Sequence, residues 1–209
     1  MPDSSWGRTT PRRVGTGAAV DIGSARAAEI ASRYGLARVV LSFGAADGGA
    51  YFGKWLRHQI MQRFGYTEVN NVYLDTVSLA EVPDTSFKKF ADAKKPWITG
   101  VASMNGGWRA YYRNAIAQCH TMIFVVTPAW SRSVWCAGEF KHFIEVNRRR
   151  LQDRETPIHG IALMAGGTID SALNLDRIQI EDNIYATGYE NWWQMDGQAL
   201  LRLFGLIRK

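Results

Sequence analysis

Cysteine is scarce in this chain of 209 residues, and long apolar runs and dense runs of charge are missing. The two cysteines, Cys119 and Cys136, cannot build a disulfide framework. No apolar stretch approaches the roughly 20 residues that a helix needs to cross a bilayer, so we expect no membrane-spanning segment. Residues 1–13 carry charges but no apolar core, so we also expect no secretory signal and a cytoplasmic, reducing location.

The net charge of +6 and the isoelectric point near 9.5 are not concentrated in any one segment. Such a basic balance is compatible with nucleic acid, an acidic membrane surface or a phosphorylated ligand, and equally with a moderately basic soluble protein. The basic runs, of which Arg148–Arg150 is one, are shorter than the five or more residues that mark a nucleic-acid tail. We therefore predict neither a nucleic-acid partner nor a membrane partner.

Sequence motifs for metals and phosphate-binding loops are also missing. The four histidines show no ligand spacing and the cysteines form no Cys-x-x-Cys pair, so we predict no bound metal. Gly15-Thr-Gly17 lacks the third glycine of a dinucleotide-binding fingerprint, and no Gly-Lys-Ser/Thr phosphate loop occurs.

The pattern of apolar residues divides the chain into an extension and one domain. Residues 1–35 are rich in small residues and arginine, and we interpret them as a partly flexible N-terminal extension, compatible with a short helix over 24–34. The domain covers residues 36–209. Compact apolar runs predict strands at 38–43, 72–75, 121–127, 157–164 and 178–180. Apolar residues at helical spacing predict helices over 50–64, 108–119, 133–151 and 191–207. Between them we expect a long insertion at 76–107 and a loop at 128–132.

Strands that alternate with helices indicate an α/β protein with a parallel sheet and helices on both faces. Five such strands predict the flavodoxin-like order 2-1-3-4-5. In these sheets a ligand lies beyond the carboxyl ends of the strands, between the first strand and the third. We therefore expect loops 43–49 and 127–132 to face each other across one cleft.

The helix predicted over 133–151 carries the side chains of interest next to that cleft. Trp135 and Glu139 are four residues apart, so they point to the same side of the helix. At about 100° per residue, Glu139 lies roughly 100° from the centre of the apolar stripe that contains Cys136 and Phe143. Taken alone, such a glutamate is most simply a solvated helix residue. Gly138, which costs about 1 kcal/mol relative to alanine in a helix, indicates a close approach at this point.

Residues 131–139, Ser-Arg-Ser-Val-Trp-Cys-Ala-Gly-Glu, resemble the third conserved box of TIR domains, including its bacterial Trp-x-x-x-Glu form. Val39–Phe43, with Asp47 four residues later, resembles the first box, a hydrophobic strand followed by Ser-aromatic-x-x-x-Asp. Val72–Asp75 resembles the second strand of these domains. The resemblance runs from about residue 38 to about residue 164, and it implies the flavodoxin-like, three-layer TIR fold.

Enzymatic TIR domains cleave the nicotinamide–ribose bond of NAD, and the resemblance assigns their catalytic carboxylate to Glu139. Nicotinamide leaves NAD as a neutral molecule, so no general acid is required. A carboxylate stabilises the cationic, oxocarbenium-like sugar as its charge develops. The implied activity is an NAD glycohydrolase or cyclase that yields nicotinamide and either ADP-ribose or a cyclic isomer. NAD is then the substrate, and no resident cofactor is expected.

The resemblance also implies a substrate site near the catalytic carboxylate. Its members are Ser42, Phe43, Gly44, Asp47, Asp75 and Trp135. Phe43 would stack on the nicotinamide or its ribose, or equally is a buried aromatic at the end of its strand; Asp47 also suits a simple turn, and Trp135 would form a wall of the cleft. Plant-type relatives have a basic residue where this chain has Gly44-Ala45. The candidates to hold the diphosphate are therefore insertion lysines, which equally suit a solvated surface: Lys88, Lys89, Lys94 and Lys95.

Several biological roles are compatible with these features. A TIR-like domain of this kind resembles the signal-producing component of the Thoeris anti-phage system, and we expect self-association through TIR–TIR contacts. The same residues suit a toxin that depletes NAD. A non-catalytic TIR adaptor is an alternative, although an adaptor has no need of a carboxylate at position 139. A third alternative is a flavodoxin-like protein that binds NAD or FMN without cleaving it.

Overall fold

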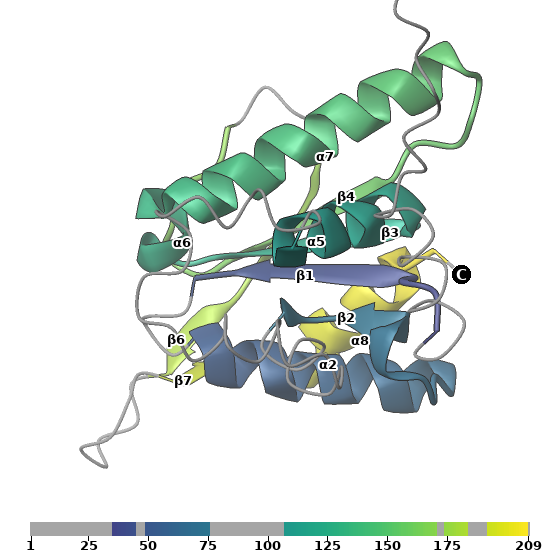
Figure 1. Cartoon of the computed structure of the whole chain (residues 1–209). Coiled ribbons are helices and arrows are strands. Elements are labelled where there is room, and N and C mark those ends of the chain that lie inside the picture. The colour runs from purple at the N-terminus through teal and green to yellow at the C-terminus, as the bar shows by residue number, and fades with distance from the viewer. Residues whose placement is uncertain (1–34, 45–48, 76–106, 171–173, 184–191, 209) are drawn as a thin grey trace, which may run out of the picture.

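The computed structural model describes residues 35–44, 49–75, 107–170, 174–183 and 192–208. Its centre is a five-stranded, all-parallel sheet in the order β2-β1-β3-β4-β5 (Figure 1). The strands are β1 (Val39–Phe43), β2 (Val72–Tyr73), β3 (Thr121–Val126), β4 (His159–Met164) and β5 (Asp176–Gln179). The predicted α/β class, flavodoxin-like topology and strand order are confirmed.

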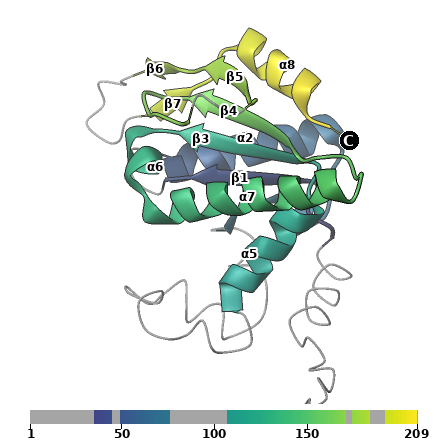
Figure 2. The same ribbon diagram turned by 90° about the horizontal axis from the view of Figure 1, so that it is seen from above.

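Helices cover both faces of this sheet and complete three layers (Figures 1 and 2). Helices α2 (Gly49–Phe64) and α8 (Gly197–Leu206) lie on one face. Helices α5 (Gly107–Gln118), α6 (Pro128–Arg132) and α7 (Val134–Gln152) lie on the other. Each layer between sheet and helices contains its own cluster of buried apolar residues.

Strand β3 shows why the sheet is buried on both sides. All six of its residues are buried, and successive side chains point to opposite faces. Ile123 and Val125 pack with α2 residues such as Leu56, whereas Phe124 packs on the α7 side. The ring of Phe124 meets Phe143 of α7 edge-on, with centroids 5.2 Å apart. Burying each such large side chain stabilises the fold by about 1.5–3 kcal/mol.

Two segments differ from the sequence-based expectation. Residues 128–132, predicted as a loop, form the short helix α6, because the side chain of Thr127 accepts a hydrogen bond from the Trp130 backbone and Pro128 occupies the first turn. The helix predicted over 191–207 begins only at Gly197, after the N-cap Asp196. The residues before it form strand β7 (Trp192–Gln194), antiparallel to β6 (Glu181–Asn183).

Some predictions fall outside the described residues. They concern the extension with its helix over 24–34, most of the insertion at 76–107, the insertion lysines and Asp47. Within the described part of the chain, no helix is both long and apolar enough to span a bilayer.

Candidate active site

Strand β1 delivers a buried polar side chain to the layer beneath α7. Adjacent residues of a strand point to opposite faces, so Ser42 and Phe43 diverge. Ser42 is 1% exposed and reaches the α7 side, where it meets Glu139. Phe43 is half-buried and packs with the apolar cluster on the α2 side.

Helices α6 and α7 place two further side chains around Ser42. Ser133 ends α6 and caps α7, since its side chain accepts a hydrogen bond from the Cys136 backbone. The indole Nε1 of Trp130 donates a hydrogen bond of 2.9 Å to Ser42 Oγ. Ser42 Oγ in turn donates one of 2.6 Å to Glu139 Oε2. This chain of donors from α6 through β1 orients the Glu139 carboxylate.

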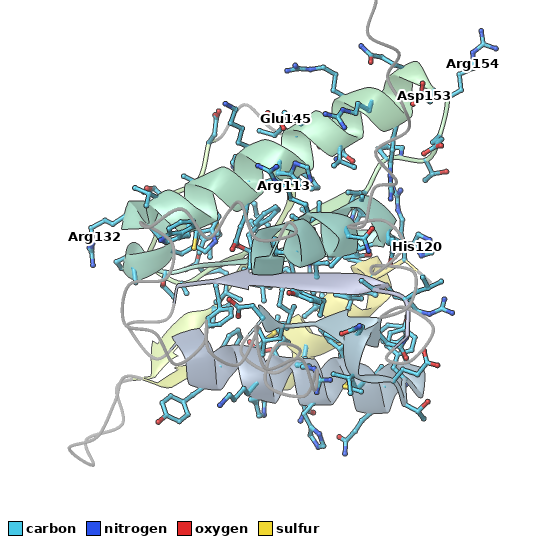
Figure 3. The ribbon with its side chains drawn as sticks, viewed as in Figure 1. Arg113, His120, Arg132, Glu145, Asp153 and Arg154 are labelled. Atoms are coloured by element: carbon cyan, nitrogen blue, oxygen red, sulfur yellow. The ribbon has the colours of Figure 1, made fainter. Side chains whose placement is uncertain are left out.

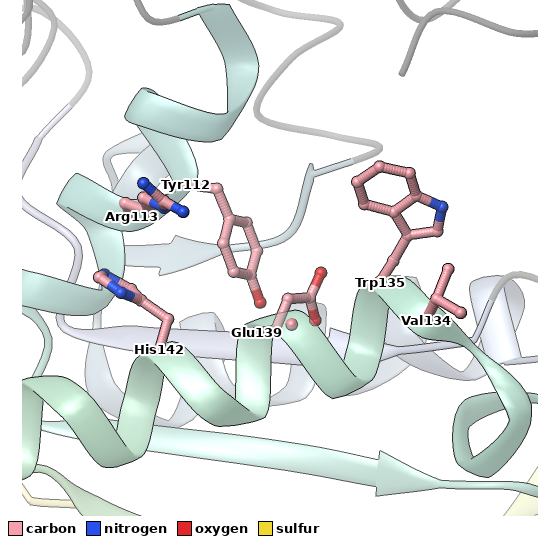
Figure 4. Close-up of a pocket in the computed structure, with 7 residues that line it drawn as sticks. Tyr112, Arg113, Val134, Trp135, Glu139 and His142 are labelled. Atoms are coloured by element: carbon pink, nitrogen blue, oxygen red, sulfur yellow. The ribbon is translucent and has the colours of Figure 1, made fainter. Parts of the chain in front are cut away.

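A pocket of about 340 Å³ lies between α5 and α7 beside that carboxylate. Its lining consists of Tyr112 and Arg113 from α5 and Val134, Trp135, Gly138, Glu139 and His142 from α7. The α7 members share one face of the helix at three- and four-residue spacing, beside the stripe that packs on the sheet. Figure 4 shows Tyr112 and Glu139 in the middle of the pocket, with Trp135 on one side and His142 and Arg113 on the other.

Burial raises the pKa of Glu139 from its ordinary value near 4.5 to about 8. The hydrogen bond from Ser42 and the hydroxyl of Tyr112 act in the opposite direction, and the negative charge of Asp75 raises the pKa further. A carboxyl group in such surroundings forms strong interactions with a cation that enters the pocket, because little water competes.

This raised pKa predicts a pH-dependent stability. Between about pH 4.5 and 8 the folded chain keeps a proton on Glu139 that the unfolded chain releases, so the group lowers stability as pH rises through that window. Glu139→Gln removes this penalty. We expect its Tm to exceed that of the wild type by at least about 3 °C more at pH 9 than at pH 5 in thermal unfolding. Equal differences at both values would contradict a desolvated carboxyl group.

The far side of the pocket carries a basic side chain. Arg113 is exposed at the pocket edge and contributes its guanidinium group to the lining. The pKa of His142 is lowered by burial and by the nearby Arg113, while contact with Glu145 opposes this. Figure 3 places Arg113 beside α7 and shows Arg132 and Arg154 at the two ends of the α6–α7 segment. Arg113 is therefore the cation of the pocket lining suited to an anionic group of a ligand.

Gly44, directly after β1, packs closely against the residues that follow β3, while residues 45–48 of the first loop lie outside the described residues, so the cleft predicted between loops 43–49 and 127–132 stays a prediction. A Cβ added to Gly44 would stand 2.7 Å from the Trp130 backbone nitrogen and 3.0 Å from the Ala129 backbone. Only a glycine permits this contact. The pocket beside Glu139 opens one layer away, between α7 and α5. Gly44 supports the site by close packing and is not part of the pocket lining.

The other residues proposed for the substrate site differ in how close they lie to the pocket. Trp135 lines the pocket, and Ser42 touches Glu139 without lining it. Asp75 is partly buried and close enough to act electrostatically on Glu139. The ring of Phe43 lies on the α2 side of β1, which does not support the predicted stacking on nicotinamide, because strand alternation directs it away from Ser42 and Glu139.

Comparison with curated proteins found a relative of this chain. The chain is similar to the 3′ cyclic ADP-D-ribose synthase HopAM1 of Pseudomonas syringae pv. tomato, with 30% identity over 120 residues. The match covers 54% of this chain and 41% of HopAM1, so the chain spans less than half the length of that relative. No family model and no solved structure matches the chain.

Most residues of the site were not predicted from the sequence: among the pocket lining only Trp135, Gly138 and Glu139 had been singled out, and Trp130 had not. Tyr112 belongs to the apolar pattern that predicts the helix over 108–119, which is correct for its ring but ignores its hydroxyl. A tyrosine at the end of an apolar stripe needs a partner for its hydroxyl, and this was the available signal. Trp130 lay in a segment predicted as a loop, so its indole had no assigned direction.

Proposed function

We propose that this chain cleaves the bond between nicotinamide and ribose in NAD. The observation that carries the proposal is Glu139, a desolvated carboxyl group held by Ser42 at the side of a pocket of about 340 Å³. Such a group favours a substrate that is cationic or becomes so, and the nicotinamide end of NAD meets this requirement. The similarity to a cyclic ADP-ribose synthase supports the same chemistry.

In the proposed reaction the bond between ribose C1′ and the pyridinium nitrogen breaks. The electron pair of that bond leaves with the nicotinamide, which becomes neutral and needs no proton. The ionised Glu139 stabilises the cationic sugar that remains. Water then captures C1′ and gives ADP-ribose and a proton, or a nucleophile within the same molecule captures it and gives a cyclic isomer. We favour cyclisation, because the relative is named for a cyclic product.

The rest of the pocket suits the other parts of NAD. Arg113 is the candidate to bind the diphosphate, in place of the insertion lysines, since guanidinium groups bind phosphate oxygens in pairs. Trp135 offers an aromatic surface for a ring. The wider setting of this chemistry, anti-phage signalling or a toxin, and self-association through TIR–TIR contacts are parts of the proposal that rest on the resemblance to TIR domains.

NAD and its reduced form NADH provide a sharp test. The dihydronicotinamide of NADH is uncharged. It would therefore leave the ribose as a nitrogen anion unless a proton were supplied to it. We expect the purified chain to release nicotinamide from NAD at least about 10³-fold faster than it releases dihydronicotinamide from NADH. Chromatography with mass spectrometry measures both rates and identifies ADP-ribose or a cyclic isomer. Binding of NAD without turnover, under crowding and with extracts of infected cells included, would favour the simple nucleotide binder.

A further inference from the structure

Tyr112 brings to the pocket a buried hydroxyl that the chemistry above does not use. The residue is 4% exposed, and its hydroxyl makes no hydrogen bond of full geometry within the described part of the chain, although it lies near enough to Glu139 to lower the pKa of that carboxyl group. Its ring is fixed by edge-on packing against Tyr73, with centroids 5.5 Å apart. A buried polar group without a partner destabilises a fold, so phenylalanine would suit this place better if packing alone mattered.

The direction of this hydroxyl is informative. Figure 4 shows the ring of Tyr112 extending from α5 with its oxygen toward the Glu139 carboxylate on α7. Ser42 approaches the same carboxylate from β1 and donates to Oε2 at 2.6 Å. An ionised carboxylate has about four acceptor positions, so it accommodates a second donor beside Ser42 and a ligand as well.

We propose, building on the NAD-cleaving function, that Tyr112 is a positioning residue whose hydroxyl donates a hydrogen bond to the Glu139 carboxylate once substrate occupies the pocket. With Ser42, it holds that carboxylate ionised and turned toward the sugar. A cationic nicotinamide ring favours the ionised carboxylate, and an ionised acceptor binds a hydroxyl more strongly than a neutral one. The hydroxyl that already lies near Glu139 thus forms its full hydrogen bond in the loaded state of the site.

The groups that act on Glu139 come from every element around it. They are Ser42 on β1, Asp75 after β2 and Tyr112 on α5, while Glu139 in turn raises the pKa of Cys136 on α7 and Arg113 and His142 line the same pocket. Asp75 disfavours the ionised carboxylate, whereas Ser42 and Tyr112 favour it. Loss of Tyr112 alone therefore shifts the balance toward the protonated form.

Tyr112→Phe tests this assignment because it removes one oxygen and keeps the ring. We expect the acidic limb of the kcat profile to move up by about 0.5–1 pH unit, which lowers kcat about three- to tenfold below that limb, while KM at pH 9 changes less than twofold. An unchanged profile would assign Tyr112 to packing alone. A raised KM with an unchanged profile would place the hydroxyl on the substrate and also overturn the proposal.

Tyr66→Phe is the matched control. Tyr66 also has a buried hydroxyl with no partner among the described residues, but it packs on the α2 side of the sheet against Phe64. We expect this variant to keep the wild-type pH profile. A shift equal to that of Tyr112→Phe would show a general effect of removing buried hydroxyls and would contradict the proposal.

A measurement independent of turnover separates this inference from the proposed function. Carbon-13 NMR of chain labelled at the glutamate carboxyls follows the titration of Glu139 directly, and Glu139→Gln identifies its signal. In the presence of N-methylnicotinamide, a cationic nicotinamide without a ribose to lose, used as the probe, Tyr112→Phe should raise the Glu139 midpoint by about 0.5–1 unit. If the shift is seen but the chain does not cleave NAD, the proposed function is refuted and the effect of Tyr112 on Glu139 stands. If the chain cleaves NAD but the shift is absent, the proposed function stands and the role of Tyr112 is refuted.

Discussion

Glu139→Gln is expected to lower kcat for NAD cleavage by about 10³-fold or more. The amide keeps the size of the side chain and can still contact Ser42, but it carries no negative charge to stabilise the cationic sugar. Because the carboxylate acts on charge that develops in the transition state, KM should change little. Nicotinamide release at saturating NAD, at pH 9 where the wild-type carboxyl is ionised, measures this directly.

Glu155→Gln is the control for this variant. Glu155 is exposed and follows Arg154, at the end of α7 opposite to α6 (Figure 3), so the same chemical change there should leave kcat within twofold. A Glu139→Gln variant that retains more than about a tenth of wild-type kcat would remove the assigned role of this carboxylate and return the adaptor hypothesis to first place.

Gly138→Leu is expected to lower kcat/KM for NAD by about 10²-fold or more, mainly through KM. Gly138 lies in the pocket lining between Trp135 and His142, and a Cβ added there meets no atom within 4 Å. The backbone of α7 is thus open to the pocket at this point, and the close approach expected at Gly138 from the sequence is wrong. The Cβ of a leucine would meet no other atom there, and we expect the rest of its side chain to occupy the pocket.

Gly138→Ala separates the effect of this position on helix stability from its effect on substrate binding. Alanine should stabilise the exposed α7 position by about 1 kcal/mol, because glycine is a poor helix former. Its methyl group should nevertheless reduce kcat/KM. A rise in Tm together with a loss of activity is not expected from a substitution that merely destabilises the fold. Ala137→Leu, on the same helix but outside the pocket lining, is the matched control and should keep wild-type kinetics. Wild-type kinetics in Gly138→Leu would show that the substrate does not use this space.

The alternation of strands and helices was sufficient to predict the sheet, because strand periodicity and helix periodicity are local properties. Strands β1, β3 and β4 agree with the predicted runs to within two residues. The helix that became α7 was predicted as well, from apolar spacing around Cys136 and Phe143. The segment before α8 failed, because the pairing of β6 with β7 depends on residues about ten positions apart.

The candidate site was predicted in part for the same reason. Glu139 and Trp135 share a helix face, which sequence spacing alone reveals. The pocket between α5 and α7 was not predicted, because it depends on where α5 packs against α7.

The sequence by itself determined a parallel α/β sheet in the order 2-1-3-4-5 and a tryptophan–glutamate pair on one helix face beside its carboxyl edge. Tertiary structure decided the surroundings of that glutamate and therefore its pKa. Burial, together with the charge of Asp75 after β2, raises its pKa to about 8, against the opposing effects of Ser42 on β1 and Tyr112 on α5. These groups lie far from Glu139 along the chain, and desolvation and charge act through space, so only the folded arrangement reveals them.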